Sequence, residues 1–421
     1  MVFLFPVSPK AISMMIVDHK MKARRILQES LLVLFLLSIC GSAQTTPEIR
    51  QKTFEKIWKT VDEKFWDPTF GGVNWRSVHD QYAPQVTAVN SDKEFYSLMD
   101  KMLGELKTSH MGVISPDEIA QYKKPPTFAG IGFREIEGKV VITHIFPGSS
   151  AAEAGIKPGF VVTQIDGVAI RSFMDAQTKV QGALNTAVKV TYLDANDEPH
   201  EVTLERRPFP VDDKSKLAGI SFYGLFDAKR LESKVGYFYF SNFLEFLNPR
   251  IKSAVESFND APGIIIDLRG NSGGDDSVGV KMANLFFDKE TQLMITKTRK
   301  GEVLDYKAKP AKQPYGGKVV ILLDEHSMSA SEEFSAGMQA SGRAVVIGRA
   351  TPGSDMDGEL EPLPDGSVLL YAHGQTRTIK DYVVEGHGVK PDLVVTLTRK
   401  ELLAGKDPDI EAALRYILNA H

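Results

Sequence analysis

The spacing of hydrophobic positions changes twice along the chain, and the first segment has the period of helices. Between residues 48 and 110, apolar residues recur at three- and four-residue steps, as on one buried helix face. The clearest run is Phe54, Ile57, Trp58, Val61 and Phe65. Further helices are predicted from Val73 and over 92–106, the last with Ser91 as its N-cap. We therefore predict a helical domain over 44–122.

The second segment, residues 127–208, has short β runs instead. Lys123-Lys124-Pro125-Pro126 marks the boundary before it. The predicted strands lie around residues 140–142, 161–162, 188–190 and 202–204, and one helix-like piece covers 150–155. This pattern predicts a small β-rich domain.

In the third segment, residues 211–421, strands alternate with helices. The predicted strands are 236–240, 263–268, 318–323 and 344–348, and the predicted helices are 250–258, 276–287 and 330–340. Such alternation is typical of an α/β layer whose strands are largely parallel and buried. The whole chain is thus predicted to be a multidomain α/β protein.

The N-terminus has the order of a signal peptide. Basic residues at 21–25 precede the apolar run Leu31 to Ile39, and the small residues of Gly41-Ser42-Ala43 follow. We expect residues 1–43 to be a leader and the protein to be exported, to a periplasm or outside the cell. Lipoprotein anchoring through Cys40 stays open, although Ile39 stands where a lipobox has a small residue. No later segment is predicted to span a membrane.

Composition narrows the chemistry. The net charge of -4 gives no reason to expect nucleic acid as a partner. Cys40 is the single cysteine of the 421 residues, so the later domains have no disulfide framework, cysteine zinc site or catalytic cysteine. No HExxH motif occurs, and we predict neither a metal site nor a cofactor.

The β-rich segment carries a peptide-binding pattern. The loop around Gly130, Ile131, Gly132 and Phe133 resembles the carboxylate-binding loop of PDZ domains, and the segments 145–159 and 165–167 continue that resemblance. Glycine lets successive N–H groups converge on an anion, and the strand that follows can pair with an extended peptide. The alternative is a small β domain with glycine turns and no ligand.

Two stretches of the third segment carry candidate chemistry. In the first, a strand over 264–268 runs into Gly273 and Gly274, whose free N–H groups can donate to an oxyanion. A plain strand-to-helix turn is the alternative; a nucleotide phosphate site is not expected, because no GxxxxGK[ST] motif occurs.

In the second stretch, Ser329 lies at the start of a helix and the N–H of Ala330 can join the oxyanion hole. Taken alone, these serines would be interpreted as N-caps. Ser327 and Ser331 are the other candidate nucleophiles.

Together these stretches resemble the C-terminal processing, or tail-specific, serine peptidases. The resemblance covers nearly the whole chain after the leader: a helical domain, a PDZ domain and a catalytic domain of crotonase/Clp-like fold. It implies that Ser329, the second serine of Ser-x-Ser-Ala-Ser-Glu, is the nucleophile of a serine endopeptidase. It also implies protein or peptide substrates whose C-terminal or extended segments the PDZ domain binds.

The sequence departs from the best-known branch of that family, which uses a lysine base. Residues 348–357 contain no lysine, and 332–337 resemble the tricorn-protease-like branch, which is related to retinoid-binding proteins. That branch uses a Ser-His pair before the PDZ domain and a glutamate near the C-terminus, here Ser109, His110 and Glu385. Histidine, with a pKa near 6.5, suits a general base at neutral pH.

Other polar residues near these motifs are interpreted as supporting ones. His326 and His387 are expected to be bystanders, or at most to line the pocket, and Asp267 and Arg269 are expected to fix the loop by hydrogen bonds. A catalytically inactive binding protein and an acyl-thioester enzyme of crotonase-like fold are the competing functions. The complete set of Ser329, His110 and Glu385 argues against the first, and the signal peptide with the PDZ pattern argues against the second. The oligomeric state is not predicted.

Overall fold

The computed structural model describes residues 45–122, 127–146, 148–208, 213–217 and 220–419. The predicted leader over 1–43, with Cys40, lies outside this part of the chain. Within the described residues, no helix has both the length and the apolar character needed to cross a membrane.

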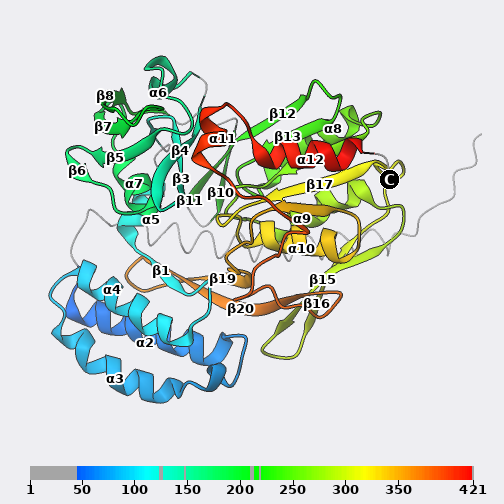
Figure 1. Cartoon of the computed structure of the whole chain (residues 1–421). Coiled ribbons are helices and arrows are strands. Elements are labelled where there is room, and N and C mark those ends of the chain that lie inside the picture. The colour runs from blue at the N-terminus through cyan, green and yellow to red at the C-terminus, as the bar shows by residue number, and fades with distance from the viewer. Residues whose placement is uncertain (1–44, 123–126, 147, 209–212, 218–219, 420–421) are drawn as a thin grey trace, which may run out of the picture.

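The N-terminal region is a group of three helices, at the lower left of Figure 1. They are α2 (Pro47–Lys64), α3 (Trp75–Ala88) and α4 (Asp92–Leu103). Side-chain oxygens of Thr46, Asn74 and Ser91 accept hydrogen bonds in their first turns, which confirms the N-cap predicted at Ser91. The apolar helix faces meet in a core that contains Phe54, Ile57, Val61, Trp75, Tyr82, Phe95 and Met99.

The middle region is a six-stranded sheet with two helices (Figure 1). Its strands run in the order β3-β4-β5-β7-β8, with β6 paired to β5, so β3 is an edge strand. The elements are β2 (Thr127–Phe128), β3 (Ile131–Ile136), β4 (Lys139–Ile145), α6 (Ser150–Glu153), β5 (Val161–Ile165), β6 (Val168–Ala169), α7 (Phe173–Val180), β7 (Ala187–Leu193), β8 (Pro199–Glu205) and β9 (Arg207–Pro208). Each predicted β run lies in a strand. Helix α7 was not predicted, because its eight residues give too little periodicity.

The third region is built on a six-stranded sheet in the order β12-β13-β14-β17-β18-β21. All neighbouring pairs from β13 to β21 are parallel, as predicted, and β12 is antiparallel. The strands are β12 (Phe226–Arg230), β13 (Gly236–Phe240), β14 (Gly263–Asp267), β17 (Lys318–Leu323), β18 (Val345–Gly348) and β21 (Leu393–Val394). A short hairpin, β10 (Asp213–Leu217) with β11 (Ile220–Gly224), precedes them.

Helices cover both faces of this sheet. Ile264 and Ile266 of β14 pack with α8 (Asn248–Ser257), α9 (Asp276–Ala283) and α10 (Ala330–Ala340). Ile265, which points the other way, packs with α12 (Pro408–Leu418). Burial on both sides explains why the strands are apolar runs rather than alternating ones. A short helix, α11 (Arg399–Leu403), links β21 to α12.

A second sheet, which the sequence did not predict, joins the helical region to the third region. It is antiparallel, in the order β1-β20-β15-β16, and β19 also pairs with β20. Its strands are β1 (Gly112–Ile114), β15 (Thr291–Thr298), β16 (Val303–Ala308), β19 (Met356–Pro362) and β20 (Val368–Thr378); α5 (Pro116–Tyr122) follows β1. Because β1 begins two residues after His110, its pairing with β20 brings that histidine to the third region.

Candidate active site

Ser329 lies in the turn between β17 and α10. Its backbone has φ 55° and ψ −126°, a conformation that a residue with a side chain adopts only when its surroundings hold it. The Ser329 N–H donates to the carbonyl oxygen of Ser354 at 3.0 Å and to Glu332 Oε2 at 3.1 Å. The turn therefore presents the side chain at the positive end of α10.

His110 reaches Ser329 from the segment before β1. Its Nε2 lies 3.2 Å from Ser329 Oγ, and its Nδ1 lies 2.9 Å from Ser109 Oγ. Ser109 donates both its N–H and its hydroxyl to Glu385, each at 2.7 Å. A hydroxyl that donates to a carboxylate is left to accept from Nδ1–H. This places the histidine proton on Nδ1 and leaves Nε2 free to accept from Ser329.

Burial sets the charge state of the histidine. It lowers the pKa of His110 below the ordinary value of 6.5, and the negative charges of Glu385 and Asp357 counter this only in part. The neutral form, which can accept a proton, is therefore the form present at neutral pH. Among the described residues no lysine hydrogen-bonds to Ser329 Oγ.

Glu332 connects the turn of Ser329 to the loop that follows β18. Its buried carboxylate accepts from the N–H groups of Gly353 at 2.8 Å and Ser354 at 2.9 Å, from the Thr351 hydroxyl, and from Ser329 N–H. Burial raises the pKa of Glu332 despite these bonds. Sequence reasoning did not assign Glu332 a role. The spacing Ser329-x-x-Glu332 is that of a capping box and could have indicated one.

Gly273 packs directly against Ser329, the predicted nucleophile. A Cβ added to it would lie 2.7 Å from Ser329 Cβ and 2.8 Å from the carbonyl oxygen of Met328. Its N–H donates to Asn271 Oδ1 at 3.0 Å, so that predicted oxyanion donor is already engaged. The N–H groups of the other two predicted donors, Gly274 and Ala330, have no acceptor among the described residues.

The other two candidate serines are fully buried and engaged. Ser327 Oγ donates to the carbonyl oxygen of Leu268 at 2.8 Å. Ser331 Oγ donates to the carbonyl and side-chain oxygens of Asn271 at 2.9 and 2.8 Å. Ser329 is therefore the hydroxyl of the three that faces the histidine.

The predicted peptide-binding loop begins β3. Gly130 has φ 88°, and a Cβ there would lie 2.0 Å from Ser149 Cβ, so only glycine fits. The side chains of Ile131 and Phe133 are buried in the core of the middle region. A ligand could therefore contact only the backbone groups of this loop, which comprises Gly130, Ile131, Gly132 and Phe133. It could also pair with the free edge of β3, beside α7.

The middle region contacts the segment that leads to Ser329. Arg134 of β3 donates through Nε to Asp324 Oδ2 at 2.9 Å, and Phe173 of α7 stacks on His326 at 4.3 Å between ring centroids. Burial disfavours the charged Asp324, but Arg134 and the N–H groups of Gly270 and His326 outweigh it and lower the pKa of that carboxyl. His326, predicted as a bystander, therefore belongs to this contact.

The remaining polar residues discussed in the sequence analysis do not contact Ser329. Arg269 forms ion pairs with Asp267, Asp407 and Asp409 at 2.6 to 2.9 Å. His387 is exposed. One group of described residues has its ligand atoms close enough to hold a metal ion: Asp194 and Glu198 of the turn between β7 and β8, and His200 at the start of β8. His200 already bonds Asp194 at 3.0 Å, and the group is largely exposed.

Comparison with known proteins follows the three regions. Residues 234–395 match Peptidase family S41, 47–104 match the Tricorn protease C1 domain, and 141–194 match the PDZ domain. A carboxyl-terminal-processing protease of Synechocystis sp. is 26% identical over 378 residues, covering 86% of each chain. A probable CtpA-like serine protease of Staphylococcus aureus is 28% identical over 323 residues, which are 75% of this chain and 62% of that protein.

Solved structures show the same fold. The photosystem II D1 C-terminal processing protease aligns over 88% of this chain and 97% of its own, with a TM-score of 0.59 and 22% identity. The tricorn protease aligns over 88% of this chain and 36% of its own, with a TM-score of 0.52 and 18% identity.

The fold and these matches define a serine-type peptidase. The matched domains and the carboxyl-terminal-processing relatives support a C-terminal processing peptidase with a helical N-terminal region, a PDZ domain and an S41 α/β domain. The inactive binding protein and the acyl-thioester enzyme are not favoured.

Proposed function

We propose that this peptidase cleaves protein substrates with Ser329 as nucleophile and His110 as general base. The observation that carries the proposal is the continuous hydrogen-bonded series from Glu385 through Ser109 and His110 to Ser329 Oγ. It resembles a catalytic triad with a serine placed between the histidine and the carboxylate.

The proposed reaction follows from this geometry. As Ser329 Oγ bonds to the scissile carbonyl carbon, its proton passes to His110 Nε2, and the carbonyl oxygen gains the negative charge. Donors to that oxygen would be the N–H groups of Gly274 and Ala330. Collapse of the adduct breaks the C–N bond, and His110 gives its proton to the leaving amine. Water then attacks the acyl-enzyme and loses a proton to His110; the bond between the acyl carbon and Ser329 Oγ breaks, the carboxylic acid product leaves, and His110 returns the proton to Ser329 Oγ. The charge of Glu385 stabilises the imidazolium through Ser109.

Labelling with a fluorophosphonate tests the nucleophile. The wild-type protein should be modified at Ser329, as located by mass spectrometry, and should cleave casein. Ser329→Ala should lose both, while Ser327→Ala, which changes a buried hydroxyl nearby, is the matched control. Label on another residue, or cleavage by folded Ser329→Ala, would disprove the assignment.

The PDZ domain is proposed to bind C-terminal or extended segments of the substrate. The free edge of β3 and the glycine loop before it support this, because an extended peptide can pair with the edge while its carboxylate meets backbone N–H groups. With Ser329→Ala in the full chain, a peptide with a free apolar C-terminus should bind better than its amide. Equal affinities would contradict the proposal.

Export is proposed from the sequence of residues 1–43. The basic, apolar and small-residue segments in that order support it. Fractionation of the expressing cells and sequencing of the mature N-terminus would test it. A start near Gln44 in an exported fraction is expected, and a lipid-modified Cys40 would establish the lipoprotein alternative.

A further inference from the structure

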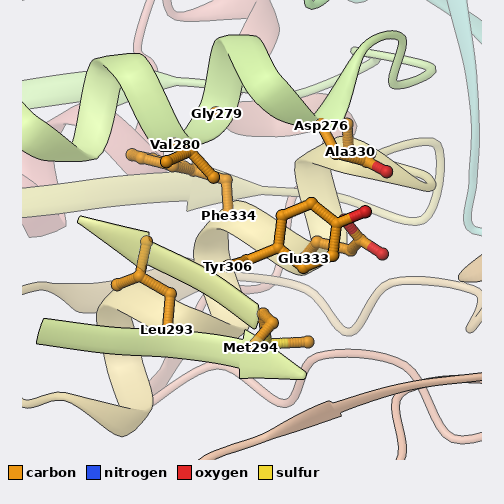
Figure 2. A pocket seen from close by; sticks show the side chains of 9 residues that line it. All are labelled: Asp276, Gly279, Val280, Leu293, Met294, Tyr306, Ala330, Glu333 and Phe334. Atoms are coloured by element: carbon orange, nitrogen blue, oxygen red, sulfur yellow. The ribbon is translucent and has the colours of Figure 1, made fainter. Parts of the chain in front are cut away.

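Two carboxyl groups that the proposed chemistry does not use face each other beside Ala330. Asp276 is the first residue of α9, and Glu333 lies in the first turn of α10. Both line a small cavity between these helices and the strands β15 and β16, and Figure 2 shows their oxygen atoms gathered at one end of it. The two side chains are hydrogen-bonded to each other. This bond therefore connects the N-terminal ends of the two helices.

A hydrogen bond between two carboxyl groups requires a proton. An ionised carboxylate only accepts, so one member of the pair must be protonated to donate to the other. Glu333 is 7% exposed, and its Oε1 also accepts from Thr376 Oγ1 at 2.8 Å, which holds this carboxyl in place. While the proton is shared, the pair has one negative charge. When the proton is lost, two negative charges face each other at close range.

The titratable groups around the pair do not balance its charge. Those that act on it most strongly are one neutral phenol, Tyr306 of β16, and three acids: Asp275 before α9, Asp355 in the loop after β18, and Asp357 of β19. Burial, together with this like charge, raises the pKa of Asp276 and of Glu333. The pair therefore keeps its proton to a higher pH than an exposed carboxyl group would.

Asp355 indicates independently that this part of the interior disfavours negative charge. Its side chain is 1% exposed, and neither of its carboxyl oxygens has a hydrogen-bond partner among the described residues. Burial, and after it the charges of Glu332, Asp276 and Glu385, raises the pKa of Asp355. A second negative charge on the neighbouring pair would therefore be strongly unfavourable.

The pair lies close in sequence to the two proposed oxyanion donors. Asp276 follows Gly274 by two residues, and Glu333 follows Ala330 by three. The N–H groups of Gly274 and Ala330 belong to different loops, so their separation depends on how the first turns of α9 and α10 are held together. An oxyanion needs both donors at hydrogen-bond distance, and a small misplacement removes much of their effect. This step rests on the function proposed above.

We propose that the proton shared by Asp276 and Glu333 keeps the two donors of the oxyanion hole at a fixed separation, and that its loss moves them apart. Both are positioning residues, since they act on the donors through the helices and do not touch the substrate. While the proton is shared, the oxyanion hole is complete. As the pH rises and the proton is lost, repulsion between the two carboxylates separates the helix ends, so kcat should fall. With the fall at low pH that a histidine base gives, the profile should have a maximum.

Replacing one carboxyl group by an amide tests the role of the proton. Glu333→Gln keeps an oxygen for Thr376 and gains an N–H that can donate to the Asp276 carboxylate at any pH. The alkaline fall in kcat for casein should therefore disappear from the pH range in which the variant stays folded by circular dichroism. Asp276→Asn is the reciprocal variant and should do the same, so one unfolded variant does not remove the test. An alkaline fall that persists unchanged in a folded variant would overturn the proposal.

Glu333→Met is the matched control, because it is similar in length and has no donor for Asp276. Its kcat should be roughly tenfold or more below that of Glu333→Gln at the pH optimum, with little change in KM, as expected when only the transition state loses stabilisation. Equal kcat in the two folded variants would contradict the proposal. Fluorophosphonate labelling separates this inference from the proposed function. A wild type without label at Ser329 fails both, whereas a labelled wild type that shows no alkaline fall overturns the inference alone.

Discussion

At the scale of residues, the proposed mechanism depends on one proton, that of the Ser329 hydroxyl. A serine hydroxyl becomes a useful nucleophile only when a base takes that proton, and His110 is placed and oriented to do so. Ser109 determines which ring nitrogen carries hydrogen, and Glu385 holds Ser109 through two bonds. Burial then keeps the imidazole neutral. Each residue of the series therefore orients the next: Glu385 holds Ser109, Ser109 fixes the tautomer of His110, and His110 accepts the proton of Ser329.

The pH dependence of turnover should report His110. Because the base acts in its neutral form, kcat/KM should fall as pH drops through the pKa of His110, and burial places that fall below pH 6.5. His110→Ala should lose roughly 10²- to 10⁴-fold in rate. Glu385→Gln should lower the rate and move the fall to still lower pH, because it removes a charge that raises the pKa of His110.

A lysine base would give a different result. Lys380→Ala and Lys390→Ala should keep the wild-type pH profile, measured with the same substrate. If kcat/KM already falls with a midpoint above pH 7 as the pH is lowered, another group is the base. Full turnover by folded His110→Ala would show the same.

At the scale of elements, Ser329 and the loop of Gly273 each lie just after the end of a strand. Ser329 follows β17, and the Gly273 loop follows β14, its parallel neighbour, so both loops emerge at one edge of the sheet. Buried parallel strands make this arrangement predictable, because they read as apolar runs that end in glycine or serine. The sequence accordingly placed β13, β14, β17 and α10 within one or two residues of their positions.

The second sheet shows where such prediction stops. β20 pairs with β1, more than two hundred residues away in the chain, and no local pattern carries that pairing. The residues Ser109, His110 and Glu385 were proposed from family resemblance, since nothing in their own neighbourhood brings them to Ser329. Likewise Glu332, Asp276 and Glu333 look like ordinary first-turn acids of a helix until packing places them around the site.

Gly273→Ala tests whether steric contact with Ser329, rather than backbone strain alone, makes glycine necessary at this position. At φ 92° a Cβ would press on Ser329 Cβ and on backbone, so the loop must move and activity should fall strongly. Gly72→Ala is the matched control: φ is 86° there, but nothing lies within 4 Å of the added Cβ. Both variants should lose about 1–3 kcal/mol of unfolding free energy from strain. Near-normal casein cleavage by Gly273→Ala would contradict the packing described.

At the scale of the whole molecule, the PDZ domain is held at two places. At the first, Arg134 and Phe173 contact the segment that leads to Ser329. At the second, the chain between β21 and α12 brings α11 against the PDZ domain, where Leu402 packs with Ile136 and Val161 (Figure 1). Two separate contacts fix the orientation of a domain better than one, so the edge of β3 keeps a fixed relation to the nucleophile segment.

Arg399 makes the polar interactions of the second contact, and Arg399→Ala should weaken the attachment of the PDZ domain there. The side chain is 13% exposed; it donates to the carbonyl oxygens of Gly159 and Asp194 at 2.8 and 2.5 Å and pairs with Asp197 at 2.6 Å. Losing hydrogen bonds of a charged group should lower the local opening free energy by about 1.5–3 kcal/mol. Amide exchange around Gly159 and 194–198 should then be roughly ten- to a hundredfold faster by mass spectrometry, with α10 unchanged.

Arg415→Ala is the matched control, since that side chain is 66% exposed and pairs only loosely with Glu411 at 3.9 Å. Equal exchange in the Arg399 and Arg415 variants would mean that Leu402 and its neighbours hold this face without the arginine.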